Sequence, residues 1–133
     1  MITLCAGLLG CAADPSELAP TEALTAFLAA LERSTHAPDQ RKLAYDWLDL
    51  ESQKALQERA RLSSSLSGRP FEPWEMLVPG RLSFAAQSLT AGRLSASIDG
   101  EHATVTMRGA DSAGGPVPMV RESGRWRVML PME

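Results

Sequence analysis

The groups that could carry acid–base chemistry in this 133-residue chain are a pair of carboxylates and two histidines. Asp46 and Asp49 lie three positions apart in a helical pattern, so both would lie on one face, where close carboxylates can share a proton. His102 alternates with apolar neighbours in a strand pattern, which directs it toward solvent, and His36 falls between two predicted helices. Asp49 is also placed to cap the helix that follows it. The positions of these four side chains favour a structural role over a catalytic one.

Basic side chains near the C-terminus could bind an anion. Arg121, Arg125 and Arg127 could meet across a final hairpin, where their guanidinium groups would grip a carboxylate or a phosphate. The alternative is cross-strand pairing with Glu122 and protection of a sheet edge. The three tryptophans fit core or lid packing better than a cage that stacks on a ligand. The residues predicted to contact a ligand or a partner are Tyr45, Asp46, Trp74, Arg121, Arg125 and Arg127.

The sequence does not predict a metal site or a cofactor. Both cysteines, Cys5 and Cys11, lie at the N-terminus, so residues 12–133 contain no thiol for a disulfide or a Cys-based metal site. The carboxylates at positions 46 and 49 have no further ligands at suitable spacing. Residues 111–115 lack the alternating acids and the distal Glu of a calcium loop.

The first eleven residues are uncharged and apolar, and they end in Leu-Leu-Gly-Cys at positions 8–11. This ending resembles a bacterial lipobox, in which a peptidase cleaves before the cysteine and the thiol carries diacylglycerol through a thioether. Cys5 follows a leucine rather than a small residue, so Cys11 is the predicted lipidation site. The resemblance implies a signal peptide over 1–10, a tether over 11–19 and a membrane partner reached through the lipid anchor.

The resemblance also implies a place in the bacterial cell envelope. Ala12 and Ala13 stand where some bacteria use an Asp for inner-membrane retention, which favours the outer membrane. The apolar run breaks at Asp14 and is too short to span a bilayer. Because no basic residue precedes the apolar run, two alternatives stay open: a true start upstream of Met1, or an apolar arm of a cytosolic protein.

The charge balance argues against one class of partner. The chain has 13 basic and 16 acidic residues, a net charge of −3, and neither half has a strong basic excess. Neutralising nucleic-acid phosphates needs such an excess. We therefore expect no nucleic-acid partner.

From residue 20 the first half of the chain has the apolar spacing of amphipathic helices. A stripe at i, i+3, i+4 and i+7 predicts a helix that starts near Pro20 and ends at 34–38. A short second helix capped by Asp39 follows, and a long third helix begins after Asp49. Residues 70–79, with three prolines, predict a one-turn helix or lid over the core. The apolar positions are Leu24, Phe27, Leu28 and Leu31, then Leu43, Ala44, Trp47 and Leu48, then Ala55, Leu56, Leu62 and Leu66.

From residue 81 the apolar period changes to two, which is typical of strands with one buried face. Asp99 and Gly100 are expected to supply the two positive φ angles of a type I′ hairpin turn. A Gly-rich connection leads to 117–120, residues 123–124 turn the chain into a last strand, and 81–90 are a candidate for a further strand. The predicted apolar faces are Leu94, Ala96 and Ile98, then Ala103, Val105 and Met107, then Trp126, Val128 and Leu130.

The order of these elements, closing on Gly-Arg-Trp-Arg-Val at 124–128, is similar to the nuclear-transport-factor-two-like cone fold over residues 20–131. The resemblance implies a curved sheet that wraps around the helices and leaves a conical pocket. Some members of that family use the pocket for isomerase or dehydratase chemistry, and many others use it only for binding.

We therefore expect the α+β fold class, with N-terminal helices packed on a curved antiparallel sheet in one domain over 20–133. The expected function is binding of a small molecule or a protein partner by a lipid-anchored envelope protein, without turnover. One alternative is a cofactor-free lyase or isomerase that uses Asp46 or His102 inside the cone. The other is a structural subunit of an envelope assembly, which forms a homodimer through its sheet face.

Overall fold

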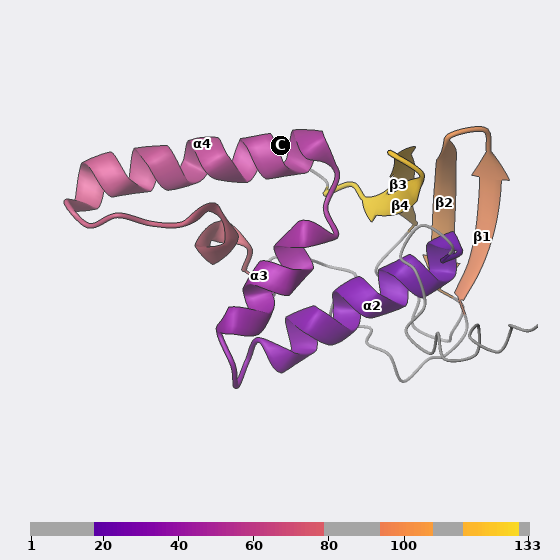
Figure 1. Cartoon of the computed structure of the whole chain (residues 1–133), viewed down its shortest axis with the longest axis horizontal. Coiled ribbons are helices and arrows are strands. Elements are labelled where there is room, and N and C mark those ends of the chain that lie inside the picture. Colours follow the sequence, from indigo (N-terminus) through magenta and orange to yellow (C-terminus); the bar gives the residue numbers. More distant parts are fainter. Residues whose placement is uncertain (1–17, 79–93, 108–115, 131–133) are drawn as a thin grey trace, which may run out of the picture.

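The computed structural model describes residues 18–78, 94–107 and 116–130. Within these ranges three α-helices and a 3₁₀-helix precede a four-stranded antiparallel sheet, which confirms the predicted α+β class. Figure 1 shows α2 beside the sheet and α4 extending away from it. The elements are α2 (Pro20–Arg33), α3 (Asp39–Asp46), α4 (Leu50–Ser67), η2 (Pro73–Met76), β1 (Leu94–Asp99), β2 (His102–Met107), β3 (Val117–Glu122) and β4 (Arg125–Val128).

Several sequence-based predictions lie outside the described residues. They are the leader with Cys11, most of the tether, the candidate strand over 81–90 and most of the Gly-rich connection before β3. They stay predictions.

Helix α2 supplies a large part of the core, as its apolar stripe predicts. All four predicted stripe positions are buried, and the small Ala23 and Ala30 widen the buried face. The first turn is closed by Glu22, whose Oε1 accepts a hydrogen bond from the backbone N–H of Ala19 at 2.8 Å. The helix lies against β1, β2 and β4, so its buried face covers one side of the sheet.

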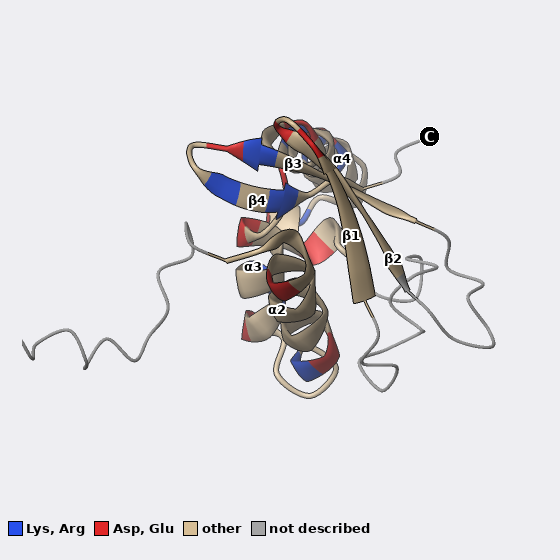
Figure 2. Cartoon of the chain, turned by 90° about the vertical axis from the view of Figure 1, so that its right-hand side faces the viewer, with Lys and Arg blue, Asp and Glu red and all other residues tan. Residues whose placement is uncertain are grey.

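The covered side of the sheet is apolar with the expected period of two in β2, β3 and β4, whereas on β1 the predicted apolar positions Ala96 and Ile98 are exposed, because β1 is the edge strand among the described residues. The strand order is β1-β2-β3-β4, and each neighbouring pair is antiparallel (Figure 2). Because side chains alternate between faces, every second residue of β2, β3 and β4 enters the core. The buried strand residues are Ala103, Val105, Val117, Met119, Trp126 and Val128.

The two hairpin turns differ from the prediction. Asp99 stays in the β1–β2 ladder opposite His102, so the loop is residues 100–101, and within it only Gly100 has a positive φ, of 65°. The pair of positive φ angles lies instead in the β3–β4 turn, at Ser123 with 53° and Gly124 with 79°. The type I′ signature therefore belongs to the second hairpin, whose closing pair is formed by the residues on either side of this turn.

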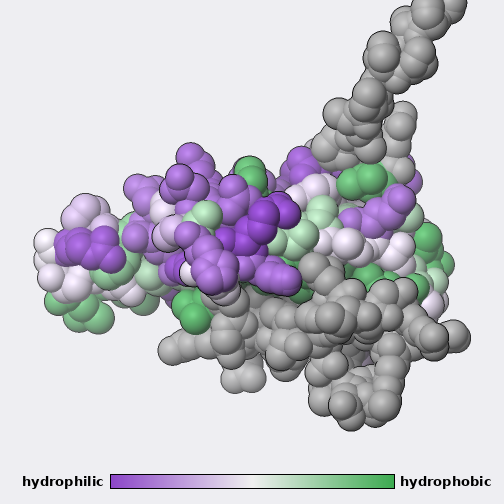
Figure 3. Space-filling model, turned by 90° about the horizontal axis from the view of Figure 1, so that it is seen from below, coloured by the Kyte–Doolittle hydropathy of each residue, from purple (hydrophilic) through white to green (hydrophobic). Residues whose placement is uncertain are grey.

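Three predicted apolar positions of α3 and α4 are exposed. Leu43 is 47% exposed, Leu62 is 46% exposed and Leu66 is 87% exposed. The physical reason is that only the first part of α4 reaches the core, through Leu56, while its outer part extends beyond it. In Figure 3 hydrophobic side chains are visible at this outer end. Asp39 is the first residue of α3 and does not cap it with its side chain.

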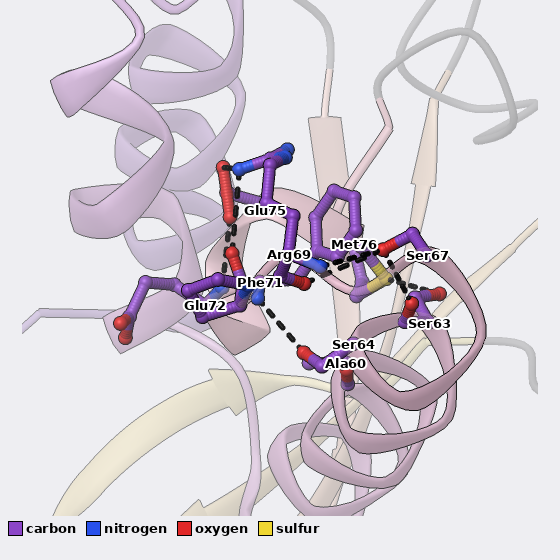
Figure 4. Close-up of polar contacts among 10 residues, drawn as sticks. Ala60, Ser63, Ser64, Ser67, Arg69, Phe71, Glu72, Glu75 and Met76 are labelled. Atoms are coloured by element: carbon purple, nitrogen blue, oxygen red, sulfur yellow. Dashed lines mark hydrogen bonds and ion pairs between the residues drawn. The ribbon is translucent and has the colours of Figure 1, made fainter.

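The segment after α4 folds back onto the outer half of the helix. The N–H of Phe71 donates to Ser64 Oγ at 2.8 Å, and Ser63 Oγ donates to Met76 Sδ at 3.7 Å (Figure 4). The predicted one-turn helix is present as η2, and Leu77, directly after it, is buried in the core. Serine side chains of α4 thus bond to this return segment: Ser64 to a backbone N–H and Ser63 to a side chain.

Candidate functional site

The site that the structure brings together begins where the end of α3 meets strand β4. Leu48 forms a parallel bridge with Val128, and the N–H of Val128 donates to the carbonyl of Trp47 at 2.9 Å. The N–H of Asp49 donates to the carbonyl of Val128 at 3.0 Å. Residues 47–49 therefore occupy the outer edge of β4 and hold the end of α3 beside the arginines of that strand.

Arg127 fixes this junction. Its Nη1 donates to the carbonyls of Asp46 at 3.0 Å and Leu48 at 3.2 Å, and its Nε lies 3.6 Å from Glu122 Oε1. Glu122 Oε1 also accepts a hydrogen bond from the N–H of Leu50, at 3.2 Å. A guanidinium matches this task because one planar group can donate to several oxygens at once. Arg127 is thus engaged with the protein's own oxygens.

Arg125 lies next to this junction, and none of the described residues supplies it with such an oxygen. Its guanidinium carbon is 4.7 Å from the ring centroid of Trp47, a cation–π arrangement. Within the described residues its guanidinium makes no hydrogen bond or ion pair, and its Nε is buried without a partner. Burial lowers the pKa of Arg125 first and the nearby charge of Arg127 lowers it further, whereas Asp46 raises it. The group is therefore a positioned, incompletely satisfied cation.

The predicted strip of three arginines does not form. In the β3–β4 register Arg121 lies opposite Trp126, whereas Arg125 lies opposite Glu122. Opposite residues share a face, so Arg121 is on the Trp126 side of the sheet while Arg125 and Arg127 are on the other. Figure 2 shows the basic residues on both strands of this hairpin. The alternative prediction, pairing with Glu122, is confirmed for Arg127.

The remaining predicted contact residues are divided between this site and other parts of the fold. Asp46 is exposed and lies at the junction, close enough to Arg125 for its negative charge to raise the pKa of that guanidinium. The Tyr45 hydroxyl points to α4, where it accepts a hydrogen bond from Gln57 Nε2 at 3.1 Å. Trp74 is half-buried in η2 and belongs to the return segment.

The acid–base candidates have structural or exposed positions. Asp49 is 3% exposed, and its Oδ1 accepts the N–H of Ser52 at 3.2 Å, so it caps α4 as predicted. Asp46, His36 and His102 are exposed. The hollow between α4 and η2, about 350 Å³ and open to solvent, is not lined by any of these four groups, whereas His36 lines a second open hollow of about 430 Å³ at the end of α2. The described ranges contain no cluster of three or more His, Cys, Asp or Glu side chains that could hold a metal ion.

Sequence reasoning assigned Trp47 to packing and missed its role as the platform under Arg125. The signal was weak because the two residues are far apart in the sequence. The bridge between Leu48 and Val128, which the pattern of each segment alone does not predict, brings them together.

Comparison of the chain with protein-family models, with curated proteins and with solved structures found no match. Among the described residues, no helix is long and apolar enough to cross a membrane.

Proposed function

We propose that this chain is a lipid-anchored protein of the bacterial cell envelope whose folded domain binds an anionic partner without turnover. The observation that carries the binding proposal is the Arg125 guanidinium, which stacks on Trp47 and makes no ion pair within the described residues. A carboxylate could accept two parallel hydrogen bonds from such a group, which gives both energy and orientation. The anchoring proposal depends on the lipobox-like ending at Cys11.

We also propose that the domain has the cone-like, nuclear-transport-factor-two-like form of the α+β class. Its support is the element order and the packing of α2 on one face of an antiparallel sheet. In this proposal the Arg125 site lies on the opposite face from the buried strand residues, so binding at Arg125 does not require a conical pocket.

The enzyme alternative has less support. A general base needs a position within reach of a bound substrate, and burial usually tunes its pKa. Asp46 and His102, the two candidates, are both exposed. Binding through an already positioned cation accounts for more of the observed contacts.

Binding is tested with a short oligoglutamate peptide as the probe, titrated against the purified chain at low and high salt. We expect Arg125→Gln to weaken peptide binding by about tenfold, because one charge-assisted contact is lost, about 1.4 kcal/mol. The matched control is Arg121→Gln, which removes the same charge from the same hairpin on the other face. Equal weakening by both substitutions, or no peptide binding by the unaltered chain, would contradict the proposal.

Anchoring is tested by intact mass and membrane fractionation of the protein expressed in its native host, beside a Cys11→Ser variant. We expect a diacylglycerol adduct on a chain that begins at Cys11, and no adduct on the variant. An uncut, unacylated chain in the cytosol would contradict the anchor and leave the Arg125 site untouched.

A further inference from the structure

Strand β1 forms the other edge of the sheet, opposite to the edge that residues 47–49 close. β1 pairs with β2 on one side, and no described segment pairs with its other side. The N–H of Arg121 donates to the carbonyl of Glu101 at 2.7 Å, which shows that the odd-numbered residues of β2 direct their backbone groups to β3. The even-numbered residues, beginning with His102, therefore face β1.

This alternation determines which β1 backbone groups have no partner in the described part of the sheet. His102, Thr104 and Thr106 lie opposite Asp99, Ser97 and Ser95, so those β1 residues make the ladder hydrogen bonds. The N–H and C=O groups of Leu94, Ala96 and Ile98 consequently point away from the sheet. They form a regular row of three donors and three acceptors.

The side chains of β1 do not protect this edge. Natural sheets commonly protect an edge strand with Lys, Pro, a bulge or a covering segment. β1 reads Leu-Ser-Ala-Ser-Ile-Asp, without Lys or Pro, and its pairing with β2 runs without a bulge. Ile98 is 58% exposed although it lies on the same face as the buried Ala103 opposite it. An apolar side chain at the end of the core face is thus left partly uncovered.

A second copy of the same strand matches this edge in register. Antiparallel pairing through outward groups requires that residues 94, 96 and 98 meet one another, and only one two-fold register pairs all three. In it Ala96 lies opposite Ala96 of the second copy, and Leu94 lies opposite Ile98. Each exposed Ile98 would then have an apolar cross-strand neighbour, which contributes a few tenths to about 1 kcal/mol per pair.

The charges of the strand are compatible with this partner. Asp99 is the single charged residue of β1 and lies at its end. The two-fold axis through Ala96 places the two Asp99 side chains at opposite ends of the strand pair, where they do not repel each other strongly. In a parallel in-register arrangement the two carboxylates would lie side by side, which is unfavourable.

We propose that two copies of this chain associate by antiparallel pairing of their β1 edges, with Ala96 at the two-fold axis. Six-residue strands paired along one edge cover less than the roughly 1,200 Å² of a standard stable interface. The dimer is therefore concentration dependent, and tethering both copies to one membrane surface would favour it. The pairing itself does not depend on the lipid anchor or on Arg125.

Cross-linking tests the register. The full chain carries Cys5→Ser and Cys11→Ser, so that an introduced cysteine is the single thiol. The Ala96→Cys variant of this chain is then oxidised at increasing protein concentration. Opposite Cα atoms in such a pair are about 5.5 Å apart, within the range of a disulfide. The matched control is Thr104→Cys, which is exposed on the next strand and lies too far from its symmetry mate. We expect a disulfide dimer for position 96 and none above background for position 104.

Sedimentation equilibrium of the same thiol-free chain tests the energetics. We expect Ile98→Lys and Ala96→Pro each to raise the dimer dissociation constant by at least about tenfold. The N–H of Ala96 makes no bond within the sheet, so proline there removes only the outward donor, and circular dichroism checks that both variants are folded. A chain that stays monomeric at the highest concentration, or equal cross-linking at 96 and 104, would overturn the proposal.

Discussion

At the β4 edge of the sheet the chain's own residues 47–49 take up the outward backbone groups, whereas at the β1 edge no described segment does so. The N–H of Val128 donates to Trp47 O, and the N–H of Leu130 donates to Ser52 Oγ at 2.9 Å. The corresponding groups of Ala96 and Ile98 lack such acceptors among the described residues.

The difference between the two sheet edges bears on both proposed functions. Closing the β4 edge brings the end of α3 against the strand. This contact places Trp47 under Arg125 and the carbonyls of Asp46 and Leu48 against Arg127. The contact between residues 47–49 and β4, which covers this sheet edge, therefore also forms the candidate binding site. At β1 no described segment takes up the outward backbone groups, which is the basis for the proposed pairing of two copies.

The largest effect is expected from truncating the buried side chain of the segment that closes the β4 edge with its backbone. Leu48 is fully buried, so Leu48→Ala is expected to lower the free energy of unfolding by about 2–5 kcal/mol through lost burial and a cavity. The matched substitution at the other edge, Ile98→Ala, is expected to lower it by less than about 1 kcal/mol. Urea unfolding at low protein concentration measures both, and similar losses would contradict the contrast between the edges.

The next effect is expected from Arg127. Arg127→Met keeps much of the side-chain length but removes the donors to two carbonyls, so we expect a loss of about 2–3 kcal/mol in unfolding free energy. Arg121→Met, at an exposed position of β3, is expected to change it by about 0.5 kcal/mol or less. A neutral Arg127→Met would mean that the junction is held by the backbone bridge alone.

Asp49 joins the closed edge to α4, and its removal is expected to have a moderate effect. Asp49→Ala removes the cap of α4 and is expected to cost about 1–2 kcal/mol. Asp39→Ala is the control, because Asp39 starts α3 without a capping hydrogen bond and is expected to cost about 0.5 kcal/mol or less. Thermal unfolding followed by circular dichroism distinguishes them, and an equal loss would show that Asp49 does not act as a cap.

The smallest effect is expected at the hairpin turns that lead into the two edges. Ser123 has a positive φ, which a residue with a Cβ adopts at a cost, so Ser123→Gly is expected to stabilise the fold by up to about 1 kcal/mol. Gly100→Ala, at a φ of 65°, is expected to destabilise it by about 1 kcal/mol. Opposite signs in urea unfolding support this reading of the turns, and a destabilising Ser123→Gly would contradict it.

The sequence predicts those parts of the fold that local periodicity determines. The buried stripe of α2 and the alternation in β2 and β4 follow directly from spacing, and both are confirmed where the residues are described. The exposure of Leu66 was not predictable, because an amphipathic stripe does not say whether a helix end extends beyond its core. The hairpin loop was displaced by one residue because Asp99 fits both a turn and a strand end.

The candidate site was only partly predictable for a related reason. Arg125 and Asp46 were among the predicted contact residues, but their association depends on the long-range bridge between Leu48 and Val128. Arg121 was wrongly grouped with them, because spacing alone does not give the cross-strand register that separates the two faces.

Amide hydrogen exchange, followed by NMR at low and at raised protein concentration, tests the contrast between the edges most directly. We expect slow exchange of the Val128 and Leu130 amides at every concentration. We expect fast exchange of the Ala96 and Ile98 amides in dilute solution and slower exchange as the concentration rises. Fast exchange at Val128, or protection of Ala96 that does not change with concentration, would contradict this contrast.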